Sequence, residues 1–76
     1  MYRRKRFYKE QYDISMRTVS RKVEWILAHA DRYPKDSVVK NGKFTFIRED
    51  VFEDVIVNQN RIDAGMNPEF KEAEHA

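Results

Sequence analysis

The chain has 76 residues, no cysteine and a net charge of +2. A chain of this length builds one small core, so a deep catalytic pocket is not expected. The absence of cysteine excludes disulfides and thiolate metal sites, and no stretch approaches the roughly 20 apolar residues that a membrane span requires.

The charges are unevenly distributed along the chain. Residues 1–48 hold 13 Lys or Arg against 5 Asp or Glu, whereas residues 49–76 hold 2 against 8. A one-sided basic field attracts a polyanion, and an acidic far side discourages binding in the wrong orientation. Nucleic acid is therefore the leading partner, although charges that only solvate a surface would give the same asymmetry.

The amino-terminal stretch "MYRRKRFYKE" has no apolar run after its charges. This pattern differs from that of a signal peptide, which needs an apolar segment at that place. We therefore expect a soluble, cytoplasmic protein that makes no membrane contact.

The first two elements in chain order are predicted to be helices. Residues 4–12 form a short helix with Tyr8 and Tyr12 one turn apart, and Ile14 and Ser15 make the turn that follows. A second helix spans residues 16–32 and ends before a proline. Ser15 can cap that helix by accepting from a free backbone N–H at or near Thr18. The broad apolar face of the second helix consists of Val19, Val23, Ile26, Leu27 and Ala30.

The next stretch, "SVVKNGKFTFI", contains two β-prone runs separated by Asn41 and Gly42. This pair tolerates positive φ at both central positions of a hairpin and predicts a tight two-residue turn.

A third helix is predicted for residues 49–63, because acids suit its start and Gly65 can end it. Its apolar side consists of Val51, Phe52, Val55, Ile56 and Ile62. Residues 1–65 then form one domain, and residues 66–76 form a disordered tail.

Two helices with a tight connection, a hairpin and a packing helix follow the order of a winged helix-turn-helix. The expected fold is thus a small α+β domain with a two-stranded hairpin as the wing and a C-terminal packing helix. In this architecture the second helix enters the major groove of DNA.

The candidate base-reading residues lie on the second helix. Arg17 and Arg21 are one turn apart, on the side away from the apolar face. A guanidinium can bridge the acceptors of guanine in the major groove. Thr18 and Lys22 would flank the two arginines as phosphate contacts. A solvated helix face is the alternative for all four residues.

Further contacts with DNA are expected from the hairpin and from the amino terminus. Lys40 and Lys43 lie at the hairpin tip, where a wing would meet the adjacent minor groove or its phosphates, or where they would only keep the turn soluble. The run "RRKR", which begins with Arg3 and Arg4, can follow the DNA backbone as a flexible arm or form a charged helix start.

No constellation for catalysis or metal binding is found. His29 and His75 have no ligand spacing around them, and the acids of residues 49–54 have no nucleophile or basic partner. We expect no enzymatic activity, no cofactor and no metal.

The segment "ISMRTVSR" resembles the turn and recognition-helix start of helix-turn-helix repressors, which commonly read Val-Ser-x-x-Thr-Val-Ser-Arg. The matching residues are Ile14, Ser15, Thr18, Val19, Ser20 and Arg21. Asp13 stands where those repressors usually have glycine, and it can adopt left-handed backbone geometry at modest cost.

From residue 38 onward, "VVKNGKFTFIREDVFEDVI" is similar to small excisionases of phages and conjugative transposons, and residues 14–56 follow their order of elements. Excisionases of this kind are related in fold to the winged domains of MerR-type regulators. The resemblance implies an architectural protein that binds double-stranded DNA, bends attachment sites and assists a tyrosine-type integrase. Since bending is costly for so small a module, cooperative self-association on DNA is expected as well.

Two alternatives remain open. A transcriptional repressor or activator of a phage or mobile element would use the same groove-reading surface. A protein-interaction module would instead present the basic face to an acidic partner.

Overall fold

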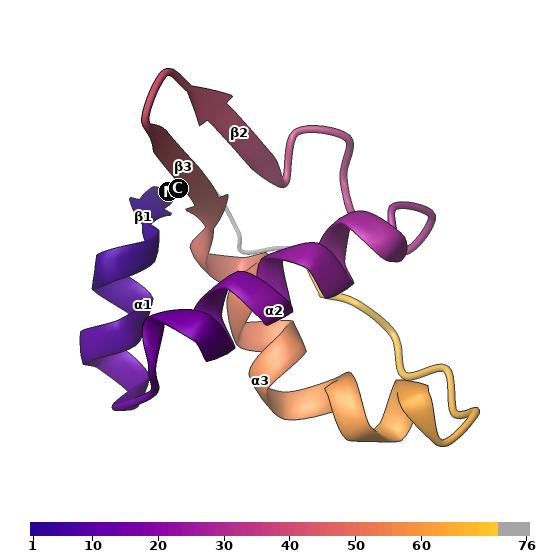
Figure 1. The fold of residues 1–76 in the computed structure, drawn as a ribbon. Helices are drawn as coiled ribbons and strands as arrows, with labels where there is room; N and C mark the ends of the chain where they lie inside the picture. Colours follow the sequence, from indigo (N-terminus) through magenta and orange to yellow (C-terminus); the bar gives the residue numbers. More distant parts are fainter. Residues whose placement is uncertain (72–76) are drawn as a thin grey trace.

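The computed structural model describes residues 1–71 and has three helices and one antiparallel sheet (Figure 1). The elements follow one another as β1 (Tyr2–Arg4), α1 (Lys5–Tyr12), α2 (Met16–Ala28), β2 (Val38–Asn41), β3 (Phe44–Arg48) and α3 (Glu49–Asp63). The α+β class expected from the sequence is confirmed.

The sheet has three strands in the order β1-β3-β2, one more than the expected hairpin. β1 pairs antiparallel with β3, with Arg3 opposite Ile47 and Arg4 opposite Phe46. The backbone N–H of Glu49 donates to the carbonyl of Met1 at 2.9 Å, which ties the first residue to the start of α3. The amino-terminal run is therefore a strand followed by a helix, rather than a flexible arm.

The hairpin is confirmed, but its turn lies one residue later than predicted. Asn41 pairs with Phe44, so the two central residues of the turn are Gly42 and Lys43. Of these two, only Gly42 has positive φ, at 62°. Positive φ at the first central position alone is the pattern of a type II′ turn, which suits the twist of the flanking strands.

α2 begins where it was predicted to begin, but it ends at Ala28 instead of residue 32. His29 closes the helix, and its backbone N–H donates to the carbonyls of Trp25 and Ile26 at 3.1 Å. Leu27, expected in the apolar face, is 49% exposed, and Ala30 is exposed as well. The early end lets the chain turn so that the two residues before Pro34 point back toward α3.

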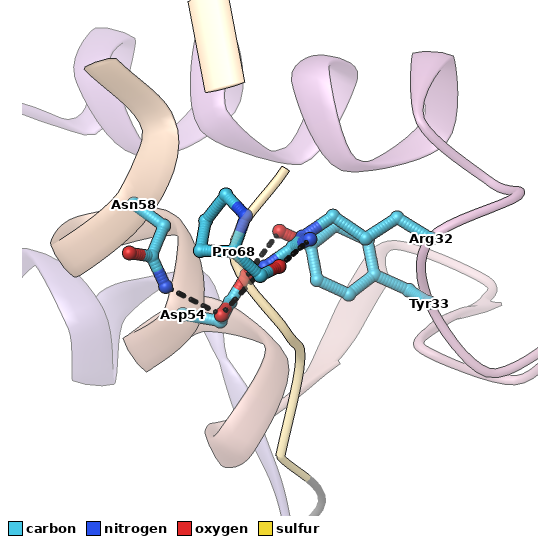
Figure 2. Close-up of polar contacts among 5 residues, drawn as sticks. All are labelled: Arg32, Tyr33, Asp54, Asn58 and Pro68. Atoms are coloured by element: carbon cyan, nitrogen blue, oxygen red, sulfur yellow. Dashed lines mark hydrogen bonds and ion pairs between the residues drawn. The ribbon is translucent and has the colours of Figure 1, made fainter. Parts of the chain in front are cut away.

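Those two residues, Arg32 and Tyr33, meet a buried carboxylate on α3 (Figure 2). Asp54 accepts from the Arg32 guanidinium at 3.1 Å on both oxygens, from the Tyr33 hydroxyl at 2.7 Å and from the Asn58 amide at 2.9 Å. Arg32 also donates to the carbonyl of Pro68. One face of α3 is thus partly polar, and Ile56, expected on its apolar side, is 36% exposed.

The core lies between the three helices and the sheet. Tyr8 stacks on Phe52 with ring centroids 4.1 Å apart, and its hydroxyl donates to the carbonyl of Ile47 at 2.6 Å. This contact joins α1, α3 and β3. The buried hydrophobic residues are Tyr8, Val19, Val23, Ile26, Tyr33, Ile47, Val51, Phe52 and Val55.

Residues 66–71 form no helix or strand, but they contact the rest of the molecule. Phe70 packs edge-on against Tyr33 with centroids 5.2 Å apart, next to the bond from Arg32 to Pro68. These contacts tie the first part of the expected tail to the segment that follows α2. The remainder of that expected tail, 72–76, lies outside the described residues.

Candidate nucleic-acid interface

The connection between α1 and α2 is tight and locally capped. Asp13 has φ 52°, the left-handed conformation that an aspartate can adopt, as expected from the sequence, and its backbone N–H donates to the carbonyl of Lys9. The Ser15 side chain accepts from the backbone N–H of Thr18 at 3.1 Å, which confirms the predicted N-cap. The Thr18 hydroxyl lies 2.9 Å from that of Ser15, so it already has a local partner.

The first two turns of α2 expose Arg17 and Arg21. Val19 and Val23 of the same helix are buried, so the two arginines project from its opposite side. No salt bridge involves either arginine among the described ion pairs of residues 1–71. Both guanidinium groups are therefore accessible to a ligand.

A groove of about 290 Å³ lies beside the start of α2. We call it the basic groove, because four of its lining side chains are cationic and none is acidic. It is lined by Arg4, Lys5, Arg6, Met16, Lys43, Phe44 and Thr45. The groove joins residues that are far apart in the sequence, and it brings the candidates Arg4 and Lys43 together.

Two contacts hold the walls of the basic groove in place. Lys5 Nζ donates to the Ser20 hydroxyl at 3.3 Å, linking the start of α1 to α2. The Arg4 guanidinium lies 4.9 Å from the centre of the Phe44 ring, linking β1 to the hairpin. Figure 1 shows the hairpin extending away from the helices, with β1 beside β3.

The hairpin lysines continue the positive surface. Lys40 is exposed and lies opposite Thr45, which lines the basic groove. Lys43 is one of the two turn residues and is also exposed. Met16 lines the groove and immediately precedes Arg17 in α2. The hairpin tip and the first residue of α2 therefore both border the basic groove.

Two of the candidate residues lie apart from that surface. Lys22 is half-buried and donates to the Gln59 side chain of α3 at 2.7 Å. Burial lowers the pKa of Lys22, and the negative charge of Asp63 offsets this effect only in part. Arg3 forms an ion pair with Glu49 and stacks over Phe7 at 4.7 Å. Both cations are thus committed to contacts within the protein.

No sequence pattern predicted Met16 and Phe44 of the groove wall as site residues, and Lys5 and Arg6 were predicted only as parts of a basic run. The available signal for Phe44 was an aromatic residue two positions after a turn glycine. Met16 gave no such signal, because a methionine at the first position of an amphipathic helix is ordinary.

Acidic side chains gather on a different surface, along α3. A second groove is lined by Asp50, Glu53, Asp54, Val57, Asn58, Glu69 and Lys71. Two of its carboxylates are already paired, Asp50 with Arg48 at 2.6 Å and Asp54 with Arg32 at 3.1 Å. The opposite charges of the two halves of the sequence therefore appear on separate grooves of the folded domain.

Over residues 1–71, no cluster of three or more His, Asp or Glu side chains is arranged to hold a metal ion. In the same range, no helix has both the length and the apolar composition needed to cross a membrane.

No protein-family model, curated protein or solved structure matches this chain.

Proposed function

We propose that the protein binds double-stranded DNA through the basic groove and the exposed arginines of α2. The observation that carries the proposal is the groove itself, in which the cationic side chains of residues 4–6 meet Lys43 of the hairpin and no acidic residue lines the walls. Binding to such a surface releases counterions from the phosphate backbone, which is the main source of affinity for DNA.

In the proposed complex α2 lies in the major groove and presents Arg17 and Arg21 to base edges. The hairpin then acts as a wing, with Lys40 and Lys43 near the backbone of the adjacent minor groove. Arg4 and Arg6 contact phosphates from the other wall of the basic groove. Lys22 and Arg3 serve the fold instead, since their charges contact Gln59 and Glu49.

Within this function, an excisionase-like role is the first one to test, because the order of elements over residues 14–56 is similar to that of small excisionases. The protein would bend an attachment site and steer a tyrosine-type integrase toward excision. A transcriptional regulator of a mobile element would use the same surface and is the second candidate.

The test of DNA binding is the double variant Arg17→Ala/Arg21→Ala. A good bidentate contact between a guanidinium and guanine contributes about 1–3 kcal/mol of discrimination, so specific retardation of the target duplex should be abolished. Both side chains are exposed, and thermal unfolding should therefore change little. Undiminished binding by this variant would refute the recognition-helix assignment.

The matched control is Lys35→Ala/Arg61→Ala, which removes the same two charges from exposed positions outside the basic groove. Binding by the control should stay close to that of the wild type. A competition with polyglutamate distinguishes DNA binding from a protein-interaction function. A module for acidic proteins would release DNA, whereas a sequence-specific DNA-binding protein would retain its duplex.

A further inference from the structure

Phe44 occupies an unusual position for a phenylalanine. It is the first residue of β3, directly after the turn residues Gly42 and Lys43, and it is 50% exposed. It lies outside the hydrophobic core and the residues packed against it. Its ring therefore contributes little to folding in comparison with the buried Phe52.

The orientation of the Phe44 ring is nevertheless constrained. The Arg4 guanidinium lies over it at 4.9 Å, and the Phe46 ring centroid is 6.5 Å away on the same face of the sheet. Asn41, opposite Phe44, ends the other strand, so the turn is as short as a hairpin allows. An exposed apolar group is thus presented at the tip of a short, hydrogen-bonded hairpin.

Phe44 also lines the basic groove, together with Met16, which is 40% exposed. A ligand that offered only anionic groups would neutralise the four cations and leave both apolar side chains in water. Duplex DNA offers both surfaces that the groove requires, phosphates along its edges and apolar base faces between its base pairs. Phe and Met are among the residues that minor-groove proteins insert between base steps.

We propose that Phe44 is an apolar wedge that enters the minor groove from the hairpin tip and partly unstacks one base step, thereby kinking the duplex. This inference rests on the DNA-binding function proposed above and adds to it a site of contact and a deformation. Arg4 and Lys43, which line the basic groove together with Phe44, contact the phosphates that flank the opened step. Flexible pyrimidine–purine steps are the preferred sites, because they are the easiest to unstack.

The experiment uses the full chain and the duplex that the wild-type protein enriches from a random-sequence library. A set of such duplexes is made, each with a single 2-aminopurine at a different step, because this base fluoresces more strongly when it loses its stacking neighbours. Binding is measured in parallel by fluorescence anisotropy, and bending by the distance between dyes at the two duplex ends.

The wild type should raise the 2-aminopurine signal at one step and shorten the end-to-end distance. Phe44→Ala should still bind but should lose both the signal and most of the bend, whereas Phe44→Leu, which keeps an apolar wedge, should retain both. Val39→Ala is the matched control, since Val39 is 39% exposed on the hairpin but does not line the groove. It should behave as the wild type does.

The wedge is refuted if Phe44→Ala binds and still produces the same fluorescence increase and the same bend. A straight wild-type complex with no unstacked step would also refute it while leaving DNA binding intact. Failure of the wild type to enrich or bind any duplex would refute the proposed function itself, and the wedge with it. Thermal unfolding of Phe44→Ala verifies that the variant is folded.

Discussion

Arg32 and Asp54 form a two-point ion pair that joins the segment after α2 to the middle of α3. The Arg32 Nε donates to one carboxylate oxygen at 3.1 Å and an NH2 group donates to the other at 3.1 Å. The side chains are only 11% and 8% exposed. Tyr33 and Asn58 donate to the same carboxylate, so both of its oxygens are fully used (Figure 2).

The first prediction concerns the stability that depends on this pair. Asp54→Ala leaves the Arg32 guanidinium buried without its counter-charge, which costs about 3–5 kcal/mol in comparable buried pairs. We expect a loss of that order in the free energy of unfolding, measured by urea denaturation. The control is Glu53→Ala, which removes the same charge from the exposed neighbouring position and should cost less than about 0.5 kcal/mol. Equal stability of the two variants would contradict the role of the pair.

The sequence did not predict this network, because its members lie far apart and look unremarkable one by one. In the sequence, Asp54 is one of several acids that favour the start of a helix. Its burial is evident only in the folded structure, where Arg32 and Tyr33, more than twenty residues earlier, contact it. These contacts also accompany the end of α2 at Ala28, four residues before the predicted end. Local periodicity cannot reveal a polar group that a distant partner makes stable in the core.

Elements with strong local signals were predicted well. α3 spans the predicted residues because acids begin it and Gly65 follows its end, and Ser15 caps α2 as expected. β1 was missed because its three residues carry no alternating pattern and form a strand only by pairing with β3. The hairpin turn shifted by one residue because Asn-Gly fits more than one turn type.

For the candidate interface, helical geometry predicted which side chains of α2 are exposed. It did not predict which cationic residues the fold brings together. Arg17 and Arg21 are exposed, as their spacing implied. Lys22, their immediate neighbour, faces α3 because Gln59 offers it an acceptor 37 residues away. The convergence of Arg4 with Lys43 depends on the pairing of β1 with β3, which the sequence did not indicate.

The second prediction is a loss of stability in alkaline solution. Burial raises the pKa of Tyr8, with the negative charge of Glu49 adding to it, and burial together with the hydrogen bond to Asp54 raises that of Tyr33. Above the usual pKa of 10, the unfolded chain loses these protons while the folded chain keeps them. The unfolded state then binds fewer protons, so the free energy of unfolding falls as the pH rises above about 10, by up to about 1.4 kcal/mol per pH unit for each tyrosine.

Denaturation curves recorded between pH 8 and 11 measure this slope, with pH values chosen to bracket the usual tyrosine pKa of about 10. Tyr8→Phe should be less stable at neutral pH by about 1–3 kcal/mol, because the buried Ile47 carbonyl loses its donor. The same variant should show a shallower alkaline decline than the wild type. An unchanged decline in Tyr8→Phe would show that the Tyr8 phenol is not responsible for it.

The third prediction concerns the hairpin lysines. If Lys40 and Lys43 contact phosphates, Lys40→Gln/Lys43→Gln should weaken binding to all sequences alike and flatten the dependence of log K on log salt by up to about two units. Specificity should survive, because base reading is assigned to α2. Lys35→Gln/Lys71→Gln removes two exposed charges elsewhere and should leave the slope unchanged. An unaltered slope in the hairpin variant would mean that the hairpin points away from DNA.

The last prediction separates an excisionase-like factor from a transcriptional regulator. Bending a site of this kind costs on the order of 1–6 kcal/mol, and a domain this small has little surface with which to offset the cost. Neighbouring copies must therefore share it, so the protein should occupy an attachment-site arm cooperatively, bend it in a circular-permutation assay and promote excision only when the matching integrase is present. Since Arg17→Ala/Arg21→Ala removes the proposed base contacts, it should abolish all three effects. Straight DNA, a single isolated bound copy and no influence on excision would reject this role, and repression of a nearby promoter under the same conditions would favour the regulator.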